Sequence, residues 1–186
     1  HHHKLTYTFM KTLTILLTVA LTILVSDATF ANPPGDIEQK LEEMGVTLYE
    51  MPPPTANYVR AVRSGNLIFL AGHGPMKPDG KNVTGKLGKD LSVAEGKEAA
   101  RYTAIALLST LKEEIGDLDQ ISRVVKVHGM VNSTPDFTDH SQVMNGFSDF
   151  MVELFGESGK HARAAVGMGS LPGTIAVEIE MVVEVK

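Results

Sequence analysis

The strongest constraint on the fold is the alternation of residue types in the C-terminal stretch, residues 174–185. Glu178, Glu180 and Glu184 are separated by even steps, and apolar residues occupy the alternate positions: Val177, Ile179, Met181, Val183 and Val185. Side chains two residues apart in a strand lie on the same face of the sheet. The stretch therefore predicts a strand with one face packed on a core and the other face carrying carboxylates.

The residues before this strand predict a partner for it. Arg163 precedes the apolar run 164–166, and a Gly-rich turn that contains Pro172 follows. This pattern is typical of two strands joined by a turn. If the turn brings Arg163 alongside Glu178, the guanidinium and the acid form a small-anion site. The alternative is that both groups are solvated, which is common on the outer face of an antiparallel sheet.

The N-terminal residues indicate sequence that is removed. Residues 1–9 resemble a purification tag with cloning residues, and residues 10–31 have a basic start, a short apolar region and a small residue at the boundary. These features predict a signal peptide cleaved after Ala31, with Ala28 as the second choice. The apolar region is shorter than the ~20 residues of a spanning helix, although an uncleaved anchor is the alternative. We expect a periplasmic or secreted protein, free of the membrane after cleavage.

Composition excludes several classes of function. The chain has 17 basic and 22 acidic residues, a formal net charge of −5, and no cysteine. An acidic chain without a basic cluster repels a nucleic-acid backbone, and no thiol or disulfide chemistry is available. The length after cleavage suffices for a single core without covalent staples.

The remaining pattern predicts the order of elements. Residues 32–51 are expected to form an N-terminal helix and a Pro-rich linker, and residues 52–186 a single domain. Within it we expect strands at 58–62, 67–71 and 121–131, and helices from Ser92 to 115 and from 133 to 155, followed by the two C-terminal strands. The order β-β-α-β-α-β-β favours an α+β sandwich with both helices on one face of a mostly antiparallel sheet. The other face must then be covered, and we expect another copy of the chain to cover it.

These segments resemble the RidA/YjgF family, whose members also carry the label endoribonuclease L-PSP. The resemblance rests on Asn57-Tyr58-Val59, Gly65-Asn66-Leu67-Ile68-Phe69-Leu70-Ala71-Gly72, His161-Ala162-Arg163-Ala164-Ala165-Val166, Leu171-Pro172 and Val177-Glu178-Ile179-Glu180. It implies a chorismate-mutase-like fold of the bacillus type that assembles as a homotrimer with clefts between subunits.

The resemblance also implies roles for single residues. Arg163 matches an arginine that binds the substrate carboxylate in bidentate fashion, which suits its planar fork. Glu178 matches an acid that positions or activates the attacking water. Tyr58 and the backbone of Gly72 and Ala165 are expected to line the cleft.

His73 is a further candidate for substrate binding because it follows Gly72 at the end of a predicted strand. The other histidines outside the tag are His128, His140 and His161, and none has the spacing of a metal motif to another ligand. No dinucleotide loop is predicted, because Gly72 and Gly74 lead into a proline and a loop. We therefore expect neither a metal nor a cofactor.

The resemblance implies an enzyme that hydrolytically deaminates small enamines or imines carrying a carboxylate. A non-catalytic protein that binds a 2-oxo acid or a similar small anion on the same scaffold is the alternative. Endoribonuclease activity ranks third because the chain is acidic and lacks a basic surface with aromatic stacking groups.

Overall fold

The computed structural model of the chain describes residues 36–186. The predicted tag residues 1–9, the predicted signal peptide 10–31 and its cleavage site after Ala31 lie outside the described residues. Within the part that is described, no helix is both long enough and apolar enough to cross a membrane.

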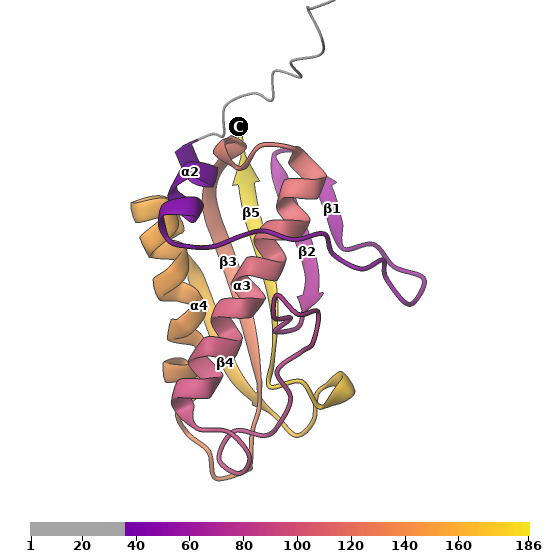
Figure 1. The fold of residues 1–186 in the computed structure, drawn as a ribbon, viewed down its shortest axis with the longest axis vertical. Coiled ribbons are helices and arrows are strands. Elements are labelled where there is room, and N and C mark those ends of the chain that lie inside the picture. Colours follow the sequence, from indigo (N-terminus) through magenta and orange to yellow (C-terminus); the bar gives the residue numbers. More distant parts are fainter. Residues whose placement is uncertain (1–35) are drawn as a thin grey trace, which may run out of the picture. The chain divides into compact units, whose positions relative to one another are not determined.

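A five-stranded sheet and the helices on one of its faces make up the domain (Figure 1). The strands are β1 (Ala61–Ser64), β2 (Leu67–His73), β3 (Ile121–Asn132), β4 (Ala162–Met168) and β5 (Val177–Val185), and the helices are α2 (Asp36–Glu43), α3 (Val93–Ile115) and α4 (His140–Phe155). The strands lie in the order β1-β2-β5-β3-β4. All neighbours are antiparallel except β3 and β4, which run parallel. The predicted α+β class and order of elements are confirmed, with the predicted N-terminal helix, α2, in front.

Helix α3 begins where the sequence predicted. The Ser92 side chain accepts a hydrogen bond from the Glu95 backbone, and the Glu95 carboxylate accepts one from the Ser92 backbone at 2.8 Å. This capping box satisfies N–H groups that the first turn of a helix leaves without partners. Gly116, with φ of 77°, ends the helix, and this left-handed conformation favours glycine.

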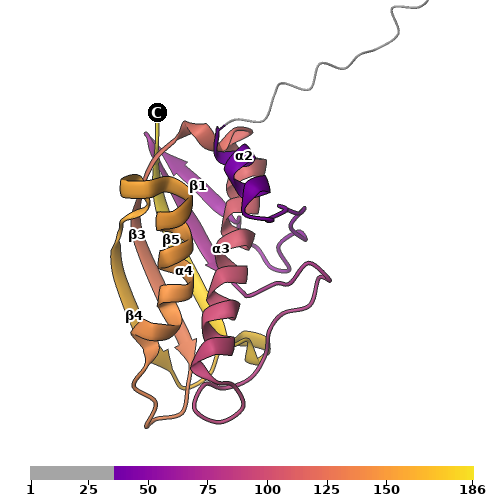
Figure 2. The same cartoon turned by 60° about the vertical axis from the view of Figure 1, so that its left-hand side comes forward.

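The two faces of the sheet differ in burial, as the alternation in β5 predicted. Helices α3 and α4 lie against one face (Figure 2), and the β5 residues on it are buried: Val177, Ile179, Met181, Val183 and Val185. On the opposite face, called the open face below, Glu180 is exposed. Large apolar residues are also exposed in the described chain, namely Tyr58, Val59, Val62, Phe69 and Val166.

Strand β4 does not form a hairpin with β5. Arg163 pairs with Val127 of β3, and Val127 pairs with Met181 of β5 on its other side. Strand β3 therefore lies between the two C-terminal strands, and the expectation of a turn that sets Arg163 alongside Glu178 is wrong. An alternation of residue types determines which face a side chain occupies, but it does not determine which strand lies next to it.

Two predicted boundaries are also wrong. Strand β1 begins at Ala61 rather than at Tyr58. Helix α4 begins at His140 rather than at residue 133, because two backbone N–H groups of the preceding turn are bonded elsewhere. Ser133 donates to the carbonyl of Met168 at 3.3 Å, and Thr134 donates to that of Leu87 at 3.0 Å.

The segment after α2 crosses the outer side of α3 on its way to β1 (Figure 1). The backbone N–H of Tyr49 donates to Ser109 Oγ at 3.3 Å, and that of Met51 donates to Glu113 Oε1 at 2.8 Å. The predicted linker is thus attached to the helical layer by hydrogen bonds.

Candidate functional site

A β-bulge in β2 shapes one half of the candidate site. Leu70 pairs with Met181 and His73 pairs with Ile179, so Ala71 and Gly72 together stand opposite the single residue Glu180. A bulge adds one residue to one strand and reverses the alternation beyond it. His73 is consequently turned to the helix-bearing face, whereas a regular strand would have placed it on the open face.

Glu178 lies directly over Gly72. A Cβ atom added at Gly72 would collide with the carboxyl group of Glu178, so glycine leaves the space that the acid occupies. Glu178 is half-buried. Burial raises its pKa above the usual value, and the nearby carboxylate of Glu180 raises it further. Both effects disfavour the charged form, so the acid is suited to accepting and releasing a proton.

Tyr58 lies near the end of β2 that contains Gly72. Tyr58 and Gly72 line a cavity of about 230 Å³ together with residues of the Pro-rich linker, among them Pro52 and Pro54. Tyr58 is 51% exposed. The structure therefore brings together four of the predicted site residues, Tyr58, Gly72, His73 and Glu178.

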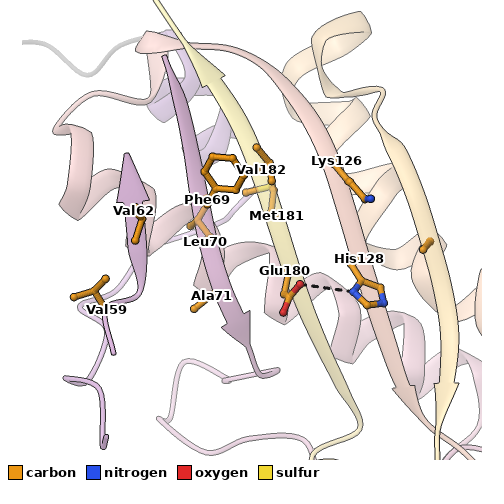
Figure 3. A pocket seen from close by; sticks show the side chains of 11 residues that line it. Val59, Val62, Phe69, Leu70, Ala71, Lys126, His128, Glu180, Met181 and Val182 are labelled. Atoms are coloured by element: carbon orange, nitrogen blue, oxygen red, sulfur yellow. Dashed lines mark ion pairs between the residues drawn. The ribbon is translucent and has the colours of Figure 1, made fainter. Parts of the chain in front are cut away.

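A wider hollow of about 530 Å³ lies on the open face, and its lining includes Ala71, next to Gly72, and Glu180. Figure 3 shows its lining, with apolar residues of β1, β2 and β5 on one side and His128 and Lys126 of β3 on the other. His128 Nδ1 lies 3.6 Å from Glu180 Oε2 (Figure 3). The hollow is thus apolar with a few charged groups, which is the usual composition of a small-molecule site or of a surface between protein copies.

Arg163 lies on the other face of the sheet, against α4. Its Nη1 donates to Asn145 Oδ1 at 2.9 Å and to Ser148 Oγ at 3.0 Å, and Nη2 lies 3.5 Å from the carbonyl oxygen of Ser141. Within one chain, Arg163 and Glu178 are therefore separated by β3 and occupy opposite faces. Ala165 follows on β4 and packs on the core, so the predicted site residues form two groups.

His73 lines the same cavity as Tyr58 and Gly72, but the residue is only 4% exposed, beneath α3. Nδ1 is 2.7 Å from the carbonyl oxygen of Ala71, and Nε2 is 2.8 Å from Thr110 Oγ1. Burial holds the pKa of His73 below its usual value. Both ring nitrogens of His73 therefore have partners within the chain, and its contact with substrate stays a prediction.

The contacts of Arg163 include residues that the sequence did not single out for a role in the site. Asn145 and Ser148 are three residues apart on α4, a spacing that places them on one face of the helix, and this spacing is visible in the sequence. Ser148 Oγ is also 3.0 Å from Nε2 of His161. The sequence does not show how α4 packs against β4, so it could not connect these two residues with Arg163.

Acidic residues that could bind a metal ion gather elsewhere in the described chain. Glu38, Asp117 and Asp119 lie together at α2. Glu38 already accepts from Lys112 Nζ at 2.5 Å and from the backbone of Leu118 at 3.1 Å. These contacts account for one carboxylate oxygen of Glu38 without a metal ion.

Comparisons with known proteins find chains of similar sequence and fold. A family described as Endoribonuclease L-PSP matches residues 49–185, so α2 precedes the matched region. Protein TCP17 of Trypanosoma cruzi is 42% identical over 151 residues, which cover 81% of this chain and 94% of that protein.

Solved structures match over a similar length. Atu1372 of Agrobacterium tumefaciens, described as a protein of unknown function, superposes with a TM-score of 0.75 at 44% identity, covering 81% of this chain and 94% of that one. A proposed endoribonuclease of Shewanella oneidensis superposes with a TM-score of 0.78 at 27% identity, covering 81% and 100%.

Proposed function

The chain belongs to the endoribonuclease L-PSP family, also called the RidA/YjgF family, and we propose that it hydrolyses small imines or enamines that carry a carboxylate. The products would be a 2-oxo acid and ammonia. The observation that carries this proposal is the environment of Glu178, a half-buried acid with a raised pKa that lies over a glycine beside an open hollow. The family itself supports small-molecule binding and assembly into oligomers.

Glu178 has the properties required for proton transfer to and from water. In the proposed reaction the Glu178 carboxylate takes a proton from water as the water oxygen bonds to the imine carbon, and it passes this proton to the nitrogen, which gives a neutral carbinolamine. The carboxylate then takes the proton of the new hydroxyl group and delivers it to the amino nitrogen as the C–N bond breaks, so that the C=O bond forms and ammonia leaves. A group with a pKa moved toward the working pH transfers protons well in both directions.

Arg163 is proposed to bind the carboxylate of the substrate. Its Nη1 donors are committed to Asn145 and Ser148. Guanidinium nitrogens bind carboxylates through pairs of parallel N–H bonds, and Nε with Nη2 forms such a pair. Nη1 is thus bonded to α4 on both hydrogens, whereas Nη2 has only a 3.5 Å contact to the Ser141 carbonyl of the same helix.

The two halves of the site are proposed to come from different copies of the chain in a homotrimer. One chain separates Arg163 from Glu178 by β3, which supports a site completed across an interface. The open face also exposes Phe69 by 46% and Val62 by 53%, and contiguous apolar surface of this kind is typical of an interaction surface. In the proposed trimer, a neighbouring copy covers that face, and its edge strand β4 lies beside β2 and β5.

The test is imine hydrolysis by the purified protein, with the imine generated in the assay by an amino-acid oxidase. Glu178→Gln is expected to lower kcat by about 10²- to 10⁴-fold, the usual contribution of a general base. Arg163→Ala is expected to raise KM by about 10- to 100-fold, since a hydrogen-bonded charge is lost.

Two control variants are matched to these. Glu184 is an acid on the same face of β5 that is bonded to Asn66, and Arg63 is an arginine on β1 that is bonded to Gly65. Glu184→Gln and Arg63→Ala should leave the kinetics unchanged. If wild-type protein does not accelerate hydrolysis but binds a 2-oxo acid through Arg163, the alternative of a non-catalytic binding protein replaces this proposal. RNA cleavage that persists in Glu178→Gln would instead favour the activity named in the family's description.

A further inference from the structure

A chain of hydrogen bonds links the start of β4 to the guanidinium of Arg163. His161 Nδ1 lies 2.7 Å from the carbonyl oxygen of Gly159, and its Nε2 lies 3.0 Å from Ser148 Oγ. The same Ser148 oxygen accepts from Arg163 Nη1 at 3.0 Å. The imidazole ring also packs edge-on against Phe147, with 5.9 Å between ring centroids. His161, Ser148 and Arg163 are therefore held as one unit between β4 and α4.

The hydrogen bond between His161 Nδ1 and the Gly159 carbonyl determines the direction of the others. A carbonyl oxygen only accepts, so Nδ1 of His161 must carry the proton. In the neutral ring, Nε2 then accepts, and the single hydroxyl proton of Ser148 is donated to it. The pKa of His161 is held below its usual value, mainly by burial and further by the charge of Arg163, which agrees with a neutral ring.

This arrangement makes Ser148 an acceptor toward the arginine. With its proton committed to His161, the Ser148 oxygen presents only lone pairs to the guanidinium. Asn145 Oδ1 accepts the other Nη1 hydrogen at 2.9 Å. Both hydrogens of Nη1 are thus occupied, and the guanidinium plane is fixed. Among the described residues, no acceptor is recorded for Nε, and Nη2 has only the longer 3.5 Å contact to Ser141.

We infer that His161 and Ser148 are positioning residues that fix the guanidinium of Arg163 with its Nε–Nη2 edge toward the ligand. This inference rests on the proposed function of Arg163, because it names what determines the affinity of that same site for a carboxylate. His161 acts through Ser148, and Ser148 acts through Arg163. A guanidinium held in one orientation loses less side-chain freedom on binding than a mobile one.

The test is a double-mutant cycle read out by calorimetric binding of 2-oxobutanoate. Ser148→Ala is expected to weaken binding by about tenfold, the value of one hydrogen bond to a charged group. In the Arg163→Ala background, the same substitution should change the affinity by less than about twofold, because residues that act through a common partner are not additive. Equal losses in both backgrounds would show a merely structural role and overturn the inference.

Ser133 supplies the matched control. It forms a second Ser–His pair, with its Oγ 3.1 Å from His140 Nε2 near the other end of α4, and it makes no recorded contact with Arg163. Ser133→Ala should leave 2-oxobutanoate binding unchanged. A loss in Ser133→Ala equal to that in Ser148→Ala would overturn the inference.

Two substitutions of His161 separate its ring nitrogens. Asn retains a donor for the Gly159 carbonyl but reaches no further, whereas Gln can place its amide oxygen where Nε2 accepts from Ser148. His161→Gln is expected to bind 2-oxobutanoate more tightly than His161→Asn, and the reverse order contradicts the direction assigned above. Should Arg163→Ala alone bind as wild type does, the proposed carboxylate site fails, which is distinct from a failure of Ser148 to act through it.

Discussion

Two histidines of this molecule have the same hydrogen-bond pattern in different surroundings. In each, Nδ1 bonds the carbonyl two residues earlier, and Nε2 bonds a hydroxyl group on the neighbouring helix, Thr110 of α3 for His73 and Ser148 of α4 for His161. His73 and Thr110 are 4% and 3% exposed. Ser148 is partly exposed and reaches Arg163. The same local unit therefore ends in the core in one place and at a charged group in the other.

The difference shows that the chemistry of a histidine depends on what its partner contacts. Burial lowers the pKa of both rings, so this shift does not distinguish them. The surroundings of the hydroxyl group distinguish them, because Ser148 bonds Arg163 whereas Thr110 lies in the core. These surroundings result from the packing of a helix on a strand and not from residues near the histidine in sequence.

The two units are expected to differ most in how far the loss of the hydroxyl group lowers the free energy of unfolding. Thr110→Val removes the hydroxyl group but keeps the side-chain volume, so Nε2 of His73 is left buried without a partner. This should lower the free energy of unfolding by about 1–3 kcal/mol. Ser148→Ala should cost less than about 1 kcal/mol, because water can reach its partners.

Urea unfolding monitored by circular dichroism measures both variants. Thr110→Val is further expected to bind 2-oxobutanoate as wild type does, in contrast to Ser148→Ala. Equal losses of stability in the two variants would contradict the difference in burial between the two units. Weaker binding of 2-oxobutanoate in Thr110→Val would mean that the His73 unit also affects the site.

A second prediction concerns the pH dependence of stability. The pKa of His73 is lowered in the folded protein mainly by burial and also by Arg60, against the opposing effects of the Ala71 hydrogen bond and Glu113. The unfolded chain therefore binds more protons below about pH 6.5. This contribution is fully present above that pH and is lost as the pH falls through the folded pKa.

The measurement is the free energy of unfolding from about pH 7.5 down to about pH 5. His73→Gln should flatten this dependence more than His161→Gln, because His73 is the more deeply buried ring. An unchanged slope in His73→Gln would assign the dependence to other groups.

Several elements could be predicted from local sequence because their cause is local. The capping box of Ser92 and Glu95 determined the start of α3, and the alternation of residues 177–185 determined the faces of β5. The parallel pairing of β4 with β3 could not be predicted, because any strand with an apolar face could have occupied that position. The position of Arg163 relative to Glu178 depended on this pairing.

The site could be predicted less completely than the fold. The bulge at Ala71 and Gly72 places His73 in the core, and a pair of small residues does not by itself predict a bulge. Ser148 and Asn145 are ordinary polar residues on a helix until α4 packs against β4. The resemblance pointed to residues in both groups, but only the structure distributes them over two faces of one sheet.

Burial shifts the pKa of Glu178 in the direction opposite to that of the two histidines. Desolvation disfavours the charged form of any group, so it lowers the pKa of the two histidines and raises that of Glu178, with Glu180 raising it further.

Glu180→Gln removes the effect of the Glu180 charge and should lower the pKa of Glu178. The acidic limb of the kcat/KM profile for imine hydrolysis should then move to lower pH, with little change at the plateau. Glu184→Gln, which removes an acid farther along the same strand, should leave the limb in place. A limb that stays in place in Glu180→Gln would mean that it reports a group other than Glu178.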